Sequence, residues 1–400
     1  MLAVGAKHSY GITPLNSGHR LIDMTGLDRF IAFDAQNGLI SAEAGLTIGD
    51  LLRIIVPKGW FIPTTPGTRF VTLGGAVAHD VHGKNHHQAG SFGCSLARLG
   101  LLRSDGSKLD LVAEQGADLY RATVSGMGLT GVISFVELML APIRSAFLDV
   151  EYVAFASIRE LLQLASESAR EFEHTVAWLD CMTNSPRLGR GIFERANWRD
   201  DGDLTPHRPR GGWTIPTDMP SFTLNQPMIR LFNTFYYRLQ ASKRARRRLH
   251  YATFFYPLDA VRHWNRLYGP RGFYEYQCVI PLRGAELVIN ELFRQMERSG
   301  ERPYFAVLKT LGAKPSPGLI AFSREGATLA LDFPNKGAKT LSLLAQFDSI
   351  IRDAGGRLYP AKDGRMSAEM FRSGYPGWSS FAQHVDPRFM SDFWAEVSAG

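Results

Sequence analysis

The stretch DVHGKNHHQAGSFG, residues 80–93, combines three histidines, one lysine and three glycines. It follows two further glycine-containing stretches, PGTR at residues 66–69 and LGGA at residues 73–76. A segment with so many glycines and so few bulky apolar residues cannot be an ordinary helix or core strand, because glycine loses more backbone entropy on folding than packing there returns. We therefore expect the backbone to approach a cofactor closely here, with the polar side chains of the loop facing a substrate.

The chain has 400 residues, 45% of them hydrophobic, which favours two domains with substantial cores. Its net charge of +7 favours an acidic partner such as a phosphate, a nucleic acid or an anionic membrane face, although a merely soluble basic protein fits as well. The three cysteines show no CxxC pair and no metal-ligand spacing, so we expect neither disulfides nor a metal site, in a reducing cytoplasm. No signal peptide and no membrane-spanning run is evident, so any membrane contact is expected to be peripheral, on the inner face.

Short strands and helices are predicted in the first third of the chain. Thr47 is the expected N-cap of the first helix. The turn at residues 104–106 is expected to connect two strands in a hairpin. Strands are predicted over residues 21–24, 29–33, 39–45, 96–102 and 109–112. Helices are predicted over residues 48–55 and 118–124, before a second glycine-rich segment at 125–133.

From about residue 146 the pattern changes to longer strands that alternate with helices. Strands are predicted over residues 147–155, 175–180, 274–281, 304–311 and 327–333. Helices are predicted over residues 158–171 and 286–298. This order is typical of an α+β domain with helices on one face of an antiparallel sheet.

Residues 200–248 form an insert rich in proline, glycine and charge, with the run LFNTFYY at 231–237 and the basic cluster KRARRR at 243–248. An aromatic segment next to a basic cluster can lie at a lipid headgroup boundary, because rings settle at the interface and cations meet anionic lipid. It could equally bind a lipid phosphate, and a solvated surface helix is an equal alternative. Nucleic-acid binding is not expected, because no recognition motif accompanies the basic residues.

Six motifs occur together in this order: VGAKHSYG at 4–11, PGTR at 66–69, LGGA at 73–76, HGKNHH at 82–87, GLTG at 128–131 and AKDGR at 361–365. This set resembles the FAD-linked oxidases of the vanillyl-alcohol oxidase fold. Within them it is most similar to the oxidase subunits of decaprenylphosphoryl-β-D-ribose 2-epimerase, over nearly the whole chain. The resemblance implies an α+β fold of two domains, with a PCMH-type FAD-binding domain over residues 1–145. It also implies an antiparallel-sheet substrate domain over residues 146–356, which contains the 200–248 insert, and a C-terminal return to the first domain over residues 357–400.

The resemblance also implies where FAD binds. Backbone amides of glycine-rich loops can ring a pyrophosphate as a nest. Residues 5–11 and 67–75 would then lie on the pyrophosphate and ribityl chain, and residues 128–132 beside the adenine half. The implied cofactor-binding residues are Gly5, Ala6, Lys7, His8, Ser9, Tyr10, Gly11, Pro66, Gly67, Thr68, Thr72, Gly74, Gly75, Ala78, His82, Gly83, Asn85, Gly128, Gly131, Val132, Ile133 and Lys362.

Oxidising a secondary alcohol requires a hydride acceptor, a group that takes the hydroxyl proton, and contacts that hold donor and acceptor together. The resemblance places Lys362 at the pyrimidine end of the flavin, where it favours the anionic reduced form and can hydrogen-bond the reacting hydroxyl. Tyr10 is the second catalytic candidate, as proton acceptor or positioning group, and His82 is the third.

Other polar residues are assigned to substrate or to structure. The implied substrate-binding residues are Lys84, Phe255, Glu275, Gln277, Lys309 and Thr328. Lys84 would act as a point charge for a phosphodiester. His86 and His87 are expected to be structural.

The sequence departs from the resembling proteins at His8. The epimerase subunit usually has an arginine there and holds its flavin noncovalently, whereas sugar-alcohol and aldonolactone oxidases of the same fold carry a histidine that bonds the flavin 8α-methyl. His8 is therefore either a covalent anchor or a residue that caps its loop through a hydrogen bond.

Further departures concern the substrate end and the start. Glu275, Thr328 and Ala330 stand where a glutamine, an asparagine and a cysteine are usual. A glutamate repels a phosphate-bearing ligand unless it is paired, so the accepted substrate can differ, and loss of the cysteine predicts no reaction with thiol-targeting inhibitors. A strand-helix-strand unit ahead of the first glycine loop is also expected from the resemblance, and its absence predicts either a misassigned start or weak flavin binding.

The leading hypothesis is FAD-dependent oxidation of the ribose 2-hydroxyl of a polyprenylphosphoryl pentose in arabinose-donor synthesis for a cell wall. An NADH-dependent partner would reduce the 2-keto product, giving net epimerisation. Two alternatives stay open: an oxygen-using oxidase of alditols or aldonolactones, favoured by His8, and a flavin-degenerate lipid-binding protein.

Overall fold

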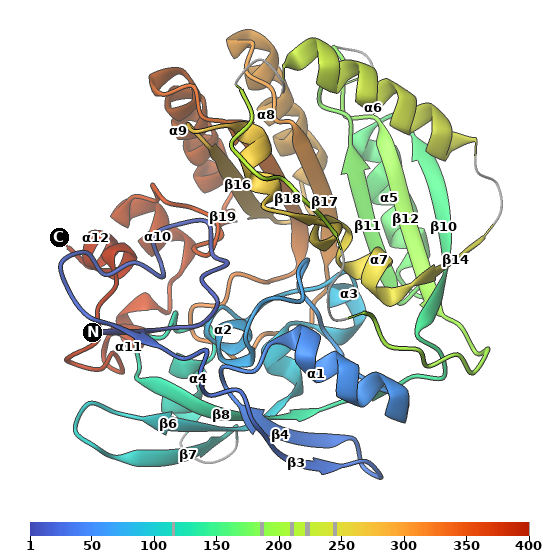
Figure 1. The fold of residues 1–400 in the computed structure, drawn as a ribbon. Coiled ribbons are helices and arrows are strands. Elements are labelled where there is room, and N and C mark those ends of the chain that lie inside the picture. Colours follow the sequence, from blue (N-terminus) through green and yellow to red (C-terminus); the bar gives the residue numbers. More distant parts are fainter. Residues whose placement is uncertain (114–116, 185–187, 209–211, 221–224, 243–245, 400) are drawn as a thin grey trace.

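The computed structural model describes residues 1–113, 117–184, 188–208, 212–220, 225–242 and 246–399. Figure 1 shows a small sheet at the bottom of the view and a large sheet above it, joined by a layer of helices and loops. The small sheet has the order β3-β4-β8-β6-β7 and the large sheet the order β14-β10-β12-β11-β17-β18-β16-β19. Neighbouring strands are antiparallel throughout both sheets, which confirms the predicted α+β class.

The first part of the chain builds the small sheet and the glycine-rich loops beside it. Its strands are β1 (Leu2–Val4), β2 (Leu21–Asp23), β3 (Phe30–Asp34), β4 (Leu39–Glu43), β5 (Trp60–Phe61), β6 (Leu96–Leu102), β7 (Lys108–Val112), β8 (Val132–Met139) and β9 (Ala141–Pro142). Its helices are α1 (Ile48–Ile55), η1 (Val56–Lys58), α2 (Leu73–Ala78), α3 (His86–Ala89), η2 (Phe92–Ser95) and α4 (Ala117–Thr123). Short helices α2 and α3 form within the glycine-rich stretches, contrary to the expectation that these are not helical, and the Thr72 hydroxyl caps α2.

Helix α1 forms where the periodicity predicts it. The Thr47 hydroxyl accepts a hydrogen bond from the Asp50 amide at 3.1 Å, which satisfies one of the free N–H groups of the first turn. Leu51, Leu52 and Ile55 are fully buried against the small sheet. Burying each such side chain stabilises the fold by roughly 1.5–3 kcal/mol, so the apolar face fixes the helix on the sheet.

The remainder of the chain builds the large sheet and returns to the first part. Its strands are β10 (Phe147–Phe155), β11 (His174–Leu179), β12 (Gly191–Trp198), β13 (Trp213–Thr214), β14 (Arg247–His250), β15 (Val261–Arg262), β16 (Phe273–Ile280), β17 (Phe305–Leu311), β18 (Gly326–Pro334) and β19 (Arg357–Leu358). Its helices are α5 (Ile158–Ser168), α6 (Gln226–Ala241), α7 (Tyr251–Phe255), η3 (Pro257–Ala260), η4 (Trp264–Tyr268), α8 (Ala285–Ser299), α9 (Ala338–Asp353), α10 (Ala368–Gly374), α11 (Trp378–Ala382) and α12 (Asp392–Ser398).

Helices α5, α8 and α9 cover one face of the large sheet (Figure 1), as the sequence predicts for α5 and α8. The predicted strands agree with the observed ones to within a residue or two, whereas α5 ends at Ser168, three residues before its predicted end. Strand β12 and helix α9 are absent from the sequence predictions. Both are held by tertiary contacts. Strand β12 pairs with β10 and β11, and Phe347 of α9 packs in the core between the helices and the large sheet.

The C-terminal segment contacts the first part of the chain. The Tyr10 amide donates to the Ala361 carbonyl at 2.9 Å, and the Asp386 amide donates to the Leu129 carbonyl at 2.8 Å. These contacts connect the C-terminal segment to the glycine-rich loops of the first part. The exact domain boundaries stay a prediction.

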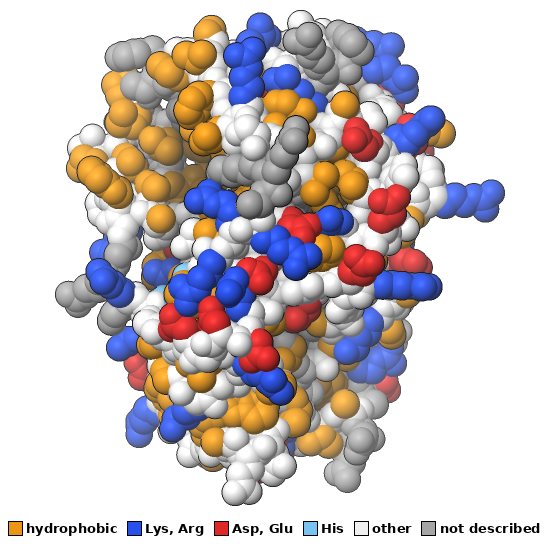
Figure 2. Space-filling view, turned by 90° about the vertical axis from the view of Figure 1, so that its right-hand side faces the viewer, with side chains coloured by type: hydrophobic (Ala, Val, Ile, Leu, Met, Phe, Trp, Pro, Cys, Tyr) orange, Lys and Arg blue, Asp and Glu red, His pale blue; other side chains and the backbone are white. Residues whose placement is uncertain are grey.

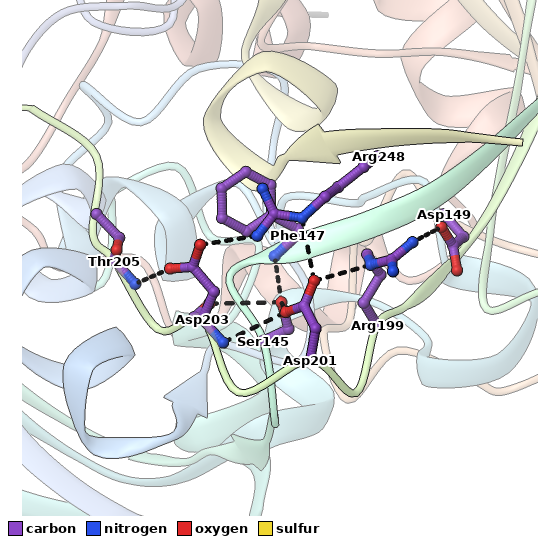
Figure 3. Close-up of polar contacts among 8 residues, drawn as sticks. All are labelled: Ser145, Phe147, Asp149, Arg199, Asp201, Asp203, Thr205 and Arg248. Atoms are coloured by element: carbon purple, nitrogen blue, oxygen red, sulfur yellow. Dashed lines mark hydrogen bonds and ion pairs between the residues drawn. The ribbon is translucent and has the colours of Figure 1, made fainter.

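A polar network joins β10, β14 and the segment after β12, as Figure 3 shows. Arg248 donates to Asp201 at 3.0 Å and to Asp203 at 2.7 Å, and its guanidinium lies over the ring of Phe147. Arg199 bonds Asp201 as well, at 2.9 Å. Part of the predicted basic cluster is therefore used to hold the first edge of the large sheet, while residues 243–245 of that cluster lie outside the described residues. Within the described residues, no helix has the length and apolarity needed to cross a bilayer.

Candidate active site

A cavity of about 870 Å³ lies where the glycine-rich loops of the first part meet strands β16, β17 and β18. Side chains of these strands alternate between two faces. On β18, Leu329 and Leu331 pack among the helices, while Thr328, Ala330 and Asp332 line the cavity. The strand period therefore determines which polar residues of the sheet reach the cavity.

Lys362 and Glu275 form an ion pair at the cavity wall. The Lys362 Nζ lies 3.1 Å from Glu275 Oε2 and 3.7 Å from the centre of the Tyr10 ring. Burial lowers the pKa of Lys362, but Glu275 and then Tyr10 raise it by more, and the net shift is upward. Burial also raises the pKa of Tyr10, so its phenol is neutral over the physiological range.

Asp332 is a second carboxyl group at the same place. It lies directly opposite Glu275 in the register of β16 and β18. Burial, followed by repulsion from Glu275, holds the pKa of Asp332 well above its usual range, although Lys362 opposes this shift. The two neighbouring carboxyl groups therefore differ: Glu275 is an ion-paired carboxylate, and Asp332 favours its protonated form.

Three further predicted residues form a hydrogen-bonded group. Gln277 Nε2 lies 3.1 Å from His82 Nε2 and 3.2 Å from Thr328 Oγ1. Burial, followed by the charge of Lys309, lowers the pKa of His82 well below its usual range. The imidazole is therefore neutral, and its Nε2 can accept the hydrogen bond that the Gln277 amide donates.

Lys309 is a cation of the cavity lining without an ion-pair partner among the described residues. Burial, followed by repulsion from Lys84 and Lys362, lowers the pKa of Lys309 to about 8. An unpaired, buried ammonium is costly unless an anion binds beside it. Lys309 is thus available to bind an anionic group in the cavity.

Most of the predicted site residues line the cavity. The predicted residues that line it are Gly5, Ala6, Lys7, His8, Ser9, Tyr10, Pro66, Gly67, Thr68, Thr72, Gly74, Gly75, Ala78, His82, Gly128, Gly131, Ile133, Glu275, Gln277, Lys309, Thr328 and Lys362. The predicted residues outside its lining are Gly11, Gly83, Lys84, Asn85, Val132 and Phe255.

The placement of Lys84 and Phe255 differs from the prediction. Lys84 Nζ donates to the Phe254 carbonyl at 2.7 Å and lies 3.6 Å from Glu194 Oε2, so its charge is used inside the protein. Phe255 is buried in an aromatic cluster with Phe61. Both residues therefore lie outside the lining of the cavity. The expected structural roles of His86 and His87 agree with their hydrogen bonds, from the Gly312 amide to His86 Nδ1 at 3.2 Å and between His87 Nε2 and the Phe172 carbonyl at 2.9 Å.

A family model for an FAD binding domain matches residues 1–111. Decaprenylphosphoryl-β-D-ribose oxidase of Mycolicibacterium smegmatis is 32% identical over 401 residues, which cover 97% of this chain and 86% of that protein. The chain belongs to the FAD-linked oxidases of the vanillyl-alcohol oxidase fold. FAD is thus its cofactor, as predicted.

Two other relatives of this FAD-linked oxidase differ in coverage. A Streptomyces coelicolor protein, named after the 5′ region of mprA in which it is encoded, is 29% identical over 87% of this chain and 98% of its own length. L-Gulonolactone oxidase of Mus musculus is 27% identical over 35% of this chain and 31% of its own length.

The glycine-rich loops that line the cavity of this FAD-linked oxidase pack closely against the protein around them. A Cβ at Gly5 would lie 2.2 Å from Thr72 Oγ1, and one at Gly74 would lie 2.9 Å from the Cβ of Ala44, so both positions exclude larger residues. Lys7 adopts a φ of 56°, which turns the backbone of the first loop. Tight loops of this kind can present backbone amides to a pyrophosphate.

Some cavity residues of the oxidase were missed from the sequence. Asp332 and Asp259 both line the cavity, and so does His79, whose Nε2 lies 3.3 Å from Thr13 Oγ1. Asp332 could have been found from the alternation of β18, because it lies two residues beyond Ala330 on the same face. No such signal marks His79, which lies at the end of α2. Among the described residues, no group of three or more histidine, cysteine or acidic side chains could hold a metal.

Proposed function

We propose that this FAD-linked oxidase oxidises a secondary hydroxyl of a sugar, the 2-hydroxyl of a polyprenylphosphoryl ribose, to the 2-keto product. The observation that carries the proposal is the similarity to decaprenylphosphoryl-β-D-ribose oxidase, which extends over 97% of the chain. The polar wall of Lys362, Gln277 and Lys309 supports it, because these side chains face the same cavity as the glycine-rich loops.

When bound, FAD supplies the acceptor for the hydride of the sugar carbon. The paired ammonium of Lys362 favours negative charge at the cofactor and can donate to the reacting hydroxyl. Tyr10 acts as a positioning group, because its raised pKa disfavours the phenolate that a proton acceptor requires, and the hydroxyl proton leaves to solvent. Its ring holds the Lys362 ammonium through a cation–π contact.

The remaining polar groups orient the sugar and its phosphate. Gln277, fixed by His82 and Thr328, presents amide groups to sugar hydroxyls. Lys309 binds the phosphodiester in place of Lys84, whose ammonium is already engaged. A separate NADH-dependent reductase would consume the 2-keto product, and net epimerisation to arabinose would follow.

A second candidate is an oxygen-using oxidase of free alditols or aldonolactones. His8 lines the cavity at the position where sugar-alcohol and aldonolactone oxidases carry a histidine, and the Glu275 carboxylate lines the cavity as well. Carboxylates also accept hydrogen bonds from neutral polyols. These two observations favour a substrate without phosphate.

Anaerobic stopped-flow absorbance separates the two candidates. A short-chain polyprenylphosphoryl ribose should bleach the flavin of the purified holoenzyme within one turnover, and the keto product should be detected by mass. Xylitol and arabinono-1,4-lactone serve as comparison substrates. Bleaching by these alone, with hydrogen peroxide formed in air, would replace the proposed substrate by the second class.

A further inference from the structure

Helix α6 presents an unusual outer face. Five large apolar side chains lie on it at helical spacing, and their exposed fractions are 54% for Met228, 70% for Leu231, 60% for Phe232, 64% for Phe235 and 45% for Leu239. Figure 2 shows the corresponding gathering of hydrophobic side chains at its upper left. We call these five residues the α6 apolar face. Single exposed apolar side chains are common, but a contiguous group marks an interaction site.

The opposite face of α6 is anchored to the large sheet. Asn233 Nδ2 donates to Asp180 Oδ1 at 3.1 Å, and the Tyr236 ring packs edge-on against Trp178 with centroids 4.9 Å apart. Arg190 lies 4.5 Å from the centre of the Tyr237 ring. These contacts fix the orientation of α6 about its own axis, so the α6 apolar face points to the solvent.

The anchor lies next to the cavity. Trp178 of β11 is the register partner of Val307 on β17, and partners in an antiparallel pair project from the same face of the sheet. Val307 lines the cavity, as does Lys309 two residues further along β17. Helix α6 therefore lies on the cavity side of the large sheet, where it packs over β10 and β12 and reaches Trp178 of β11, the strand next to β17.

The charge of this surface is basic. Helix α6 contains Arg230 and Arg238 and no acidic residue. Arg247 at the start of β14 is exposed, and neither it nor Arg238 forms an ion pair with a described residue. Arg246 and Arg248 are neutralised by Glu151 and by the aspartates of Figure 3, so they do not contribute.

We propose that the α6 apolar face docks on a membrane leaflet that contains anionic lipid. An amphipathic helix with apolar side chains outward and arginines beside them binds such an interface through buried apolar area and attraction to headgroups. Docking brings the cavity side of the large sheet to the lipid surface. Docking gives the proposed lipid-linked substrate a route to the cavity. The docking proposal itself does not depend on the identity of that substrate.

Vesicle co-sedimentation of the full-length holoenzyme tests this proposal. The probes are vesicles of phosphatidylcholine alone and vesicles with an equal share of phosphatidylglycerol. The wild type should partition onto the anionic vesicles, and Phe232→Ser with Phe235→Ser should lower its partition coefficient by about tenfold or more. The matched control is Ile31→Ser with Leu287→Ser, which removes two apolar side chains of 55% and 72% exposure from other elements.

Several results would overturn the proposal. One is a wild type that stays in the supernatant with anionic vesicles, and another is a control variant that loses as much binding as the α6 variant. Sedimentation velocity provides the third: a dimer that only the α6 variant abolishes would assign the face to a second copy of the chain. Flavin bleaching by a water-soluble substrate should be the same in all variants, so failure of the docking proposal and failure of the proposed function are separable.

Discussion

Lys362 and Glu275 pair at 3.1 Å although they lie on different parts of the chain, one after β19 and the other on β16. The side chains are 24% and 10% exposed, so water screens the pair only partly. Burial lowers the pKa of Lys362, and Glu275 is the largest influence that raises it. We therefore expect the glutamate to keep the lysine charged, as an anionic reduced flavin beside it would require.

Replacing this lysine should slow chemistry without releasing the cofactor. We expect Lys362→Ala to bleach its flavin about 10²- to 10³-fold more slowly in the reductive half-reaction, because one preorganised electrostatic group is lost. Anaerobic stopped-flow measures the rate, and the visible spectrum of the purified variant confirms that flavin is retained. A normal bleaching rate would remove Lys362 from the catalytic machinery.

Glu275→Gln should change substrate preference. The substitution removes a negative charge near the cavity and also the ion-pair partner that raises the pKa of Lys362, so flavin bleaching should slow. The KM for a phosphate-bearing substrate should fall by about tenfold, or about 1.4 kcal/mol, relative to the KM for a neutral polyol. The KM for a neutral polyol should stay the same or rise. Glu286→Gln, which alters a carboxylate paired with Arg159 away from the cavity, is the matched control. An unchanged ratio of the two KM values would show that Glu275 does not select the substrate.

Lys309 should make binding of a phosphate-bearing substrate depend on pH. Its pKa is lowered to about 8, so the side chain is charged below pH 8 and neutral above it. The KM for the phosphate-bearing substrate should therefore rise as pH increases through 8. Lys309→Arg should shift this rise to higher pH, because guanidinium keeps its proton, and Lys309→Met should give a high KM at every pH. A profile that is the same in Lys309→Met and wild type would contradict the assignment.

We expect His8 to determine how the flavin is held. Its ring lines the cavity and forms no hydrogen bond to a described residue, which favours the anchor over the loop cap. Burial lowers the pKa of His8, so the imidazole is neutral and nucleophilic. We expect acid precipitation to leave the yellow colour in the protein pellet, and His8→Ala to release it to the supernatant. Colour in the wild-type supernatant would show a noncovalent flavin.

Ala330 should protect the enzyme from thiol-directed inhibitors. It lines the cavity at the position of the expected cysteine, while Cys181 and Cys278 are buried. After the flavin is reduced, such an inhibitor should form no adduct with cavity residues of the wild-type protein. Ala330→Cys should gain one adduct, which peptide mass spectrometry should locate at residue 330. Equal labelling of both proteins at cavity residues would contradict this expectation.

Local patterns predicted those parts of the fold that depend on nearby residues. The period of residues 48–55 and the capping hydroxyl of Thr47 belong to one short segment, and α1 has the predicted bounds. Helix α9 was missed, because its place is set by packing below the large sheet. The apolar periodicity of α6 did not predict that its apolar face is exposed, because an apolar stripe on a helix normally marks the buried side.

The sequence by itself determined the family, the α+β class and the cofactor, because glycine-rich loops of fixed order carry their signal in residue identity alone. Only the tertiary structure decided which charges meet. Lys84 lies in the motif with His82, yet Glu194 of β12 and the Phe254 carbonyl hold its ammonium away from the cavity. Lys309 and the Glu275–Asp332 pair reach the cavity through strand register. Coulomb interactions depend on distance in space, and sequence spacing does not specify that distance across a sheet.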